Sequence, residues 1–258
     1  MERPALDVPA LRAALGERWA RVDVVAQTGS TNADLIADTA APDRTLLAAE
    51  DQIAGRGRLE RSWQTPARAG LTVSFLVRPA TPVSTWGWVP LLAGLALRHA
   101  VPETFSSLKW PNDLLNPDGR KLAGILAQTT GEAVVIGIGL NVTTTAEELP
   151  VETASSMLLS GAANLDRTRL LIDLAQGLDH RLAQWQDVNG DAEACGLAAD
   201  YAQACVTLGR EVRVSLLDGS VVDGRAAEIA PDGRLRVDVG GELITIGAGD
   251  VEHLRPNA

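Results

Sequence analysis

The sequence predicts an α+β fold, in which helices and strands mix over most of the chain and a small all-β module follows. Apolar segments of strand length alternate with segments of helical spacing over roughly the first 200 residues. Beyond them only short alternating strands separated by glycine-containing turns remain. Hydrophobic residues make up 46% of the 258 residues, a proportion typical of a folded globular protein.

The larger, N-terminal part is expected to combine several helices with a sheet. Helices are expected over residues 6–19, from about 31 to 39, over 84–100 and over 166–186. The second of them begins where Thr31 and Asp34 have the spacing of a capping box. The last helix has an apolar face that we expect to pack on the core, made of Leu171, Leu174, Leu178, Leu182 and Trp185. Strands are expected over 22–26, 45–50, 71–77, 107–110, 121–129 and 133–142, the last two paired.

Residues 205–258 are predicted to form a separate C-terminal module, and residues 1–204 the larger domain. Residues 211–217 alternate apolar and polar side chains, and Asp218-Gly219 then supplies a hairpin turn. Two further glycine turns follow, at residues 232–233 and 240–241. Short strands in a module of about 50 residues predict a small, partly open β-barrel of the SH3 kind.

The composition predicts a soluble, cytoplasmic protein that binds neither DNA nor a membrane. The N-terminal segment is too charged for a signal peptide, and the longest apolar stretch, around residues 89–100, is too short to span a bilayer. Cys195 and Cys205 have no zinc or redox spacing and are interpreted as reduced thiols. The net charge of −10 argues against a nucleic-acid surface, which needs a basic footprint.

Residues 53–68 are rich in arginine, whereas the chain as a whole is negatively charged. This segment contains two glycines and a cluster of arginines, namely Arg56, Arg58, Arg61 and Arg68. Glycine lets a backbone approach an anion closely, guanidinium groups bind phosphate and carboxylate, and the nearby Trp63 indole can cover a nucleobase. Because the arginines repel one another, we expect residues 53–68 to become ordered when an anion binds. A solvated, flexible basic loop is the alternative interpretation.

Other segments carry weaker signals. Lys109-Trp-Pro-Asn-Asp113 places a lysine at a strand end before a rigid turn, as in a polarising centre or in an ordinary turn with a solvated lysine. The GxG at residues 137–139 lacks the third glycine and the helix of a dinucleotide site, and the chain has no Gly-Lys for a P-loop. The histidines lie far from any hydrolase or metalloprotease motif and are interpreted as surface or capping residues: His99, His180 and His253.

Taken together, the chain resembles the biotin protein ligases. Five motifs occur in that family's order: STN at 30–32, the GRGRxxRxW loop within 52–63, KWPND at 109–113, RKLAG at 120–124 and GIGxN at 137–141. The resemblance spans residue 22 to the C-terminal module. It implies a mixed-sheet catalytic domain of the class II aminoacyl-tRNA synthetase and biotin synthetase type over 1–204, with an SH3-like barrel over 205–258. It also resembles a short form without an N-terminal DNA-binding domain.

The resemblance implies an activity, its cofactors and its partner. Biotin would be activated with ATP and Mg²⁺ to biotinyl-5′-adenylate. The biotinyl group would then pass to a specific lysine of the biotin carboxyl carrier protein of an acetyl-CoA or acyl-CoA carboxylase. A DNA or membrane partner is not expected.

The resemblance also implies the site residues. The biotin-binding set is Ser30, Thr31, Asn32, Gln52, Arg56, Gly57, Arg58, Lys109 and Gly124. The ATP- and adenylate-binding set is Gly55, Arg58, Arg61, Trp63, Asn112, Lys121 and Asn141. The catalytic set is Lys109, Arg58 and Asp113. Lys109 would bridge the biotin carboxylate and the α-phosphate, and Asp113 would accept the proton of the carrier lysine or else stabilise its turn. Leu59-Glu60 departs from the family's pattern. The Glu60 carboxylate is expected to reduce the positive charge of the arginine loop.

Three other functions remain open at this point. A lipoate ligase is not expected to combine GRGRxxRxW with KWPND. A transcriptional repressor needs an N-terminal helix-turn-helix domain of at least roughly 50 residues. A silent biotin-binding protein would have no need of Lys109 and the arginine loop.

Overall fold

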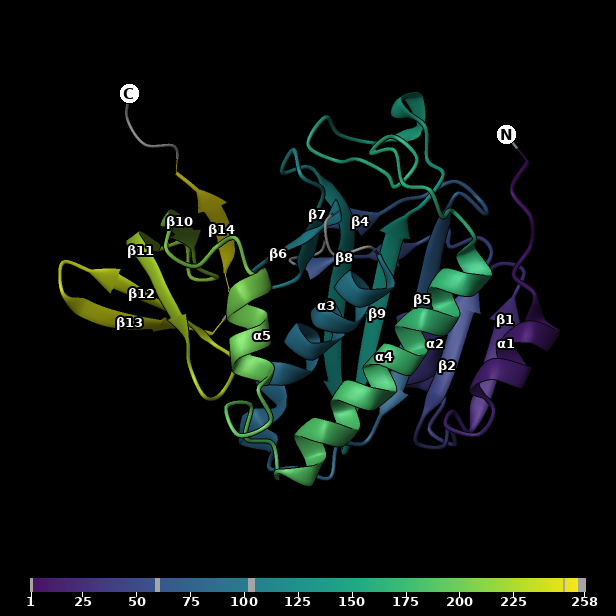
Figure 1. The fold of residues 1–258 in the computed structure, drawn as a ribbon, viewed down its shortest axis with the longest axis horizontal. Coiled ribbons are helices and arrows are strands. Elements are labelled where there is room, and N and C mark those ends of the chain that lie inside the picture. Colours follow the sequence, from purple (N-terminus) through teal and green to yellow (C-terminus); the bar gives the residue numbers. More distant parts are fainter. Residues whose placement is uncertain (1, 59–60, 102–104, 248, 255–258) are drawn as a thin grey trace.

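The computed structural model describes residues 2–58, 61–101, 105–247 and 249–254, so Leu59 and Glu60 lie outside the described residues. In these ranges a mixed seven-stranded sheet has helices on both faces, and a second sheet lies beside it (Figure 1). The strands of the large sheet, in spatial order, are β1 (Arg21–Val25), β2 (Thr45–Ala49), β5 (Gly70–Val77), β9 (Ala133–Asn141), β8 (Lys121–Thr130), β7 (Asp113–Leu115) and β6 (Ser107–Lys109). Only β1 and β2 run parallel. The expected pairing of the segments at 121–129 and 133–142 is confirmed.

Alternate residues of the central strands face two different cores. Val134 and Ile136 of β9 belong to the main cluster, which α1 (Val8–Leu15), α3 (Val89–Ala100) and α4 (Arg167–Asp187) cover. Val135 belongs to a smaller cluster under α2 (Thr31–Ala37) on the other face. Further along that second face the strands carry glycine and polar side chains. The sheet is therefore packed on one side and only partly covered on the other.

Helix ends differ from the expectations in three places. The first helix spans only Val8–Leu15, because Asp7 caps it and its end lies at Gly16. The expected capping by Thr31 is wrong: Ser30 is the cap and accepts from the Ala33 amide, while the Thr31 side chain contacts Ser74. The segment 84–100 divides into a 3₁₀ turn, Val83–Trp88, and α3. The expected core face of α4 is confirmed, since its five predicted apolar residues are all buried.

The C-terminal module is an antiparallel sheet in the order β13-β12-β11-β10-β14. Its strands are β10 (Glu211–Ser215), β11 (Val221–Ile229), β12 (Leu235–Val239), β13 (Glu242–Ile246) and β14 (Asp250–His253). The three predicted turns are confirmed, and their glycines have positive φ angles, as with Gly219 at 85° and Gly233 at 84°. β13 and β14 share no ladder in the described residues, so the barrel is partly open.

Two tryptophan N–H groups hold the module against the large domain. Trp88 Nε1 donates to the carbonyl of Pro231 at 2.9 Å, and Trp110 Nε1 donates to that of Gly233 at 3.3 Å. Both carbonyls belong to the turn between β11 and β12. One hydrophobic cluster runs from the large domain into the module, with α5 (Leu197–Ala204) between them. The division at residues 204/205 stays a prediction.

In the described part of the chain, no helix combines the length and apolar character that crossing a bilayer requires. The apolar stretch at 89–100 forms α3, and its side chains are mostly buried against the sheet and α4.

A buried ion pair holds together the end of β2 and the start of β5, the two strands that flank the arginine segment in the sequence. Arg167, in the first turn of α4, contacts Glu50 just after β2 at 2.7 Å, and both side chains are buried. Arg167 also donates to the carbonyls of Gly70 at 3.2 Å and Pro4 at 2.6 Å. The Leu6 amide donates to Glu50 at 2.6 Å. This pair therefore joins the N-terminal segment, α4, and the ends of β2 and β5.

We expect Arg167→Met to lower the free energy of unfolding by about 3 kcal/mol, because it leaves the nearly buried Glu50 carboxylate with the half-exposed Arg68 guanidinium, 4.0 Å away, in place of the closer Arg167. Urea denaturation measures the loss. Arg169→Met is the matched control, since the Arg169–Asp173 pair on the same helix is largely exposed and its loss costs about 0–1 kcal/mol. Equal losses in the two variants would contradict this account of the anchor.

Candidate active site

A cavity of about 1120 Å³ lies on the partly covered face of the large sheet, bordered by the arginine segment and by β14 of the C-terminal module. A volume of this size exceeds that of an ordinary small-molecule pocket, so it has room for two ligands side by side. Its floor is the glycine-bearing face of β8 and β9, at Gly124, Gly137 and Gly139.

The cavity brings together nearly all of the predicted site residues. Those that line it are Ser30, Thr31, Asn32, Gln52, Arg56, Gly57, Arg58, Arg61, Trp63, Lys109, Asn112, Asp113, Lys121, Gly124 and Asn141. Gly55 does not line it. A Cβ at Gly55 would lie 2.5 Å from the Trp63 carbonyl and overlap the Gln52 amide, so this glycine lets β3 (Gly55–Arg56) pair with β4 (Ser62–Trp63).

One end of the cavity is a hydrogen-bonded relay of small polar side chains. Ser74 donates to Asn32 Oδ1 at 2.6 Å and is therefore the acceptor for the Thr31 hydroxyl at 2.7 Å. Asn32 Nδ2 donates to Gln128 Oε1 at 2.8 Å, and the Thr31 amide donates to Gln52 Oε1 at 3.0 Å. The relay fixes which atoms of Asn32 and Gln52 are donors and which are acceptors. Sequence reasoning missed Ser74, although the polar Thr72 and Ser74, two positions apart in an otherwise apolar strand, could have indicated it.

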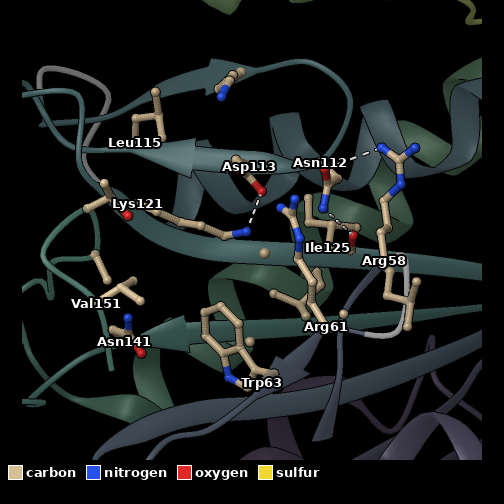
Figure 2. Close-up of a pocket in the computed structure, with 18 of the residues that line it drawn as sticks. Arg58, Arg61, Trp63, Asn112, Asp113, Leu115, Lys121, Ile125, Asn141 and Val151 are labelled. Carbon is tan, nitrogen blue, oxygen red and sulfur yellow. Dashed lines mark hydrogen bonds and ion pairs between the residues drawn. The ribbon is translucent and has the colours of Figure 1, made fainter. Parts of the chain in front are cut away.

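The other end of the cavity presents an aromatic ring on a glycine floor. The Trp63 indole lies against Gly139 so closely that a Cβ there would overlap the ring. Lys121 Nζ lies 5.9 Å from the centroid of the same ring and 2.6 Å from Asp113 Oδ1 (Figure 2). The Trp63 Nε1 proton is buried without an acceptor among the described residues. Asn141 Nδ2 donates to the Ser155 carbonyl at 3.0 Å, which holds the loop after β9 beside the ring.

Two arginines reach from the β3–β4 side toward the KWPND turn and the module. Arg58 donates to Asn112 Oδ1 at 3.4 Å (Figure 2) and to the Gly249 carbonyl at 3.3 Å. Arg61 forms an ion pair with Asp250. Burial lowers the pKa of the Arg58 guanidinium, and the carboxylates of Asp113 and Asp250 act in the opposite direction. Arginine nevertheless stays protonated in proteins, so both groups remain cations.

Lys109 ends β6 and forms no ion pair within the described residues, although its side chain lines the cavity. The chain has two lysines, Lys109 and Lys121, and both line this cavity. Lys121 is committed to Asp113, so Lys109 is the ammonium group left to meet an anion. The Lys121–Asp113 ion pair also occupies the Asp113 carboxylate, which was predicted to accept the proton of the carrier lysine.

The interpretation of His253 as a surface or capping residue is wrong, because it is half-buried in β14 and lines the cavity. Trp110 N donates to Thr207 Oγ1 at 3.1 Å, and that hydroxyl lies 3.1 Å from His253 Nε2. Burial lowers the pKa of His253 to about 4, with the charges of Lys109 and Arg210 acting in the same direction. The ring is therefore neutral near pH 7, and we assign the Thr207 hydroxyl as donor to Nε2, which places the ring proton on Nδ1.

The low pKa of His253 predicts an acid-sensitive contribution to stability. Between its ordinary value of 6.5 and about 4, the unfolded chain binds a proton that the folded protein does not. The free energy of unfolding of the wild type should therefore fall more steeply from about pH 7 to about pH 5 than that of His253→Gln. Urea denaturation at several pH values measures both slopes. His180→Gln, on the exposed side of α4, is the control, and parallel slopes for wild type and His253→Gln would contradict the assignment.

Comparisons with known proteins agree with this geometry. Residues 21–141 match the Biotin/lipoate A/B protein ligase family, and residues 207–254 match the biotin protein ligase C-terminal domain. The chain is 47% identical to the biotin–[acetyl-CoA-carboxylase] ligase of Mycobacterium tuberculosis, over 98% of the chain and 97% of that protein. The chain belongs to the biotin protein ligase family. The resemblance inferred from its motifs is thus confirmed.

One further sequence relative and one solved structure also resemble this chain. It is 29% identical to the bifunctional ligase/repressor BirA of Bacillus subtilis, over 92% of the chain and 74% of that protein. Its structure superposes on the biotin protein ligase from Aquifex aeolicus in complex with biotin and ATP with a TM-score of 0.76. That match covers 92% of this chain and all of the other at 23% identity, and it confirms the predicted fold class.

Proposed function

We propose that this chain joins biotin to ATP to form biotinyl-5′-adenylate and then transfers the biotinyl group to a lysine of a biotin carboxyl carrier protein. The observation that carries the proposal is the two-ended cavity, with a fixed polar relay at one end and an indole on a glycine floor at the other. ATP–pyrophosphate exchange tests it: biotin should support exchange and lipoate should not.

The relay end suits the ureido ring of biotin, which has both N–H donors and a carbonyl acceptor. Thr31 holds Gln52 Oε1, so that the Gln52 Nε2 protons remain as donors toward the cavity. Asn32 is held by Ser74, Gln128 and the Leu126 carbonyl, so its amide cannot rotate without breaking three hydrogen bonds. A preorganised set of this kind recognises a ligand without the entropy of ordering each side chain on binding.

The first reaction joins two anions. A biotin carboxylate oxygen attacks the α-phosphorus of ATP, the bond to the bridging oxygen breaks, and pyrophosphate leaves. In this proposal Lys109 neutralises the approaching carboxylate and the α-phosphate, because its ammonium group pairs with no carboxylate among the described residues. Arg58 and Arg61 meet the phosphates that leave, and Trp63 covers the adenine.

Mg²⁺ is expected with ATP. The carboxylates that line the cavity are Asp113, Asp250 and Glu252, and the described residues contain no cluster of three metal-binding side chains. Mg²⁺ commonly binds through substrate phosphates and one or two carboxylates, so these residues fit an ion that enters on the nucleotide. When bound, it would supply positive charge to the polyphosphate.

The second reaction consumes the mixed anhydride. The amine of the carrier lysine attacks the acyl carbon, an amide bond forms and AMP leaves with the electrons of the broken bond. The amine must lose a proton, and Asp113 remains our candidate acceptor if Lys121 shifts toward the nucleotide and frees the carboxylate. We place the reaction in the cytoplasm, an assignment that the two free thiols, Cys195 and Cys205, support.

We expect Lys109→Ala to reduce biotin-dependent ATP–pyrophosphate exchange by about 100- to 1,000-fold, because it removes a preorganised cation from the reacting groups. Thermal unfolding should be unchanged, since Lys109 has no ion-pair partner within the described residues. Lys121→Ala, which removes the chain's other lysine, should mainly raise KM for ATP. Near-normal exchange by a folded Lys109→Ala protein would remove Lys109 from the mechanism.

Two glycines of β9 allow the two ends of the cavity to be tested separately. A Cβ at Gly137 would overlap the Asn32 amide, and a Cβ at Gly139 would overlap the Trp63 indole. Overpacking of this kind costs about 1–3 kcal/mol, which corresponds to roughly a 5- to 150-fold change in affinity. Gly137→Ala should therefore raise KM for biotin, and Gly139→Ala should raise KM for ATP.

Each variant is the control for the other, since both add one methyl group to the same strand face. Exchange kinetics with each substrate varied in turn measure the two KM values. Equal effects of both variants on both substrates would argue against separate biotin and nucleotide ends.

A further inference from the structure

Asp250 of the C-terminal module belongs to the cavity, although no motif indicated it. It begins β14, is in register with Ser215 of β10, and forms an ion pair with Arg61. The preceding residue, Gly249, accepts a hydrogen bond from Arg58 through its carbonyl at 3.3 Å. Both arginines that we assign to the nucleotide phosphates therefore have an acceptor on the module.

The Arg61–Asp250 pair is too exposed to serve mainly as a folding contact. The Arg61 side chain is 65% exposed and that of Asp250 is 39% exposed, and ion pairs in such positions contribute little to stability. For the same reason Arg61 can change its partner. The several oxygens of a polyphosphate compete successfully with the single Asp250 carboxylate for the Arg61 guanidinium.

The reaction creates a need for such an exchange. While ATP is bound, Arg58 and Arg61 can donate to phosphate oxygens. After the first step pyrophosphate leaves, and the adenylate retains a single phosphate group. The guanidinium groups cannot lose their charge, so they need other acceptors or must turn to solvent. At the same stage the anhydride has to be kept from water until the carrier lysine arrives.

Building on the function proposed above, we propose that Asp250 is a positioning residue for the stage between the two reactions. When pyrophosphate leaves, Arg61 forms its ion pair with Asp250, and Arg58 donates its hydrogen bond to the Gly249 carbonyl. The β3–β4 strands then stay drawn to the C-terminal module, and the adenylate stays in the cavity. Asp250 acts through Arg61 and does not touch the reacting atoms.

The test is the retention of biotinyl-adenylate by Asp250→Asn, which removes the charge and keeps the shape. The adenylate is formed from labelled biotin and ATP, excess substrates are removed, and released adenylate is trapped with hydroxylamine. The chain has two lysines, and both line the cavity, so hydroxylamine competes with few amines of the protein itself for the released adenylate. We expect release about 2- to 5-fold faster than in the wild type, the range that an exposed ion pair supports, measured as the first-order loss of adenylate that has already formed.

Two further proteins make the test specific. Asp223→Asn breaks the Arg213–Asp223 pair, an equally exposed pair of the same module whose residues do not line the cavity, and should release adenylate at the wild-type rate. In an Arg61→Gln background, Asp250→Asn should cause no further acceleration, because the two residues act as one unit.

Wild-type retention by Asp250→Asn would overturn the proposal. A lower KM for ATP without faster release would also overturn it, since Asp250 would then only compete with the nucleotide. Failure of the proposed function is distinguishable from both, because the wild type would show no biotin-dependent exchange at all.

Discussion

The site depends on the absence of two side chains from one strand. In β9 the residues that face the helices are large and apolar, such as Ile136 and Ile138, whereas Gly137 and Gly139 face the cavity. Asn32 and Trp63 lie directly on the backbone of these glycines. Positions two apart on a strand are separated by roughly 7 Å, so the polar relay and the indole are neighbours on one rigid floor. In the function that we propose, this spacing places the biotin carboxylate near the α-phosphate.

Local patterns predicted the elements whose residues repeat strongly along the chain. The apolar stripe of α4, the β8–β9 pair and the turn at Asp218-Gly219 are of this kind, because spacing alone determines which side chains are buried or which turn forms. The start of α2 was misjudged for the opposite reason. Ser30 and Thr31 are both able to cap a helix, and the contact of Thr31 with Ser74, a residue 43 positions away, decides between them.

The motifs predicted which residues gather around the cavity, but not how they pair there. Asp113 was expected to be available to a proton, yet it holds Lys121. His253 was set aside because no nearby residue in the sequence suggested chemistry, and it lines the cavity through the register of β14. Arg61 and Asp250 are 189 positions apart. Pairings of this kind follow from how the C-terminal module packs on the sheet, which neither periodicity nor a motif encodes.

The contacts of Trp110 join Lys109, the residue before it, to the C-terminal module. The Trp110 amide donates to Thr207, whose hydroxyl also contacts His253, and the Trp110 indole donates to the Gly233 carbonyl in the β11–β12 turn. The backbone at Lys109 is thus fixed by the same module that supplies Asp250. A shift of the module would move the acceptor of Arg61 and the end of β6 together. The predicted boundary at residues 204/205 therefore separates two stretches of sequence, but the cavity includes side chains from both.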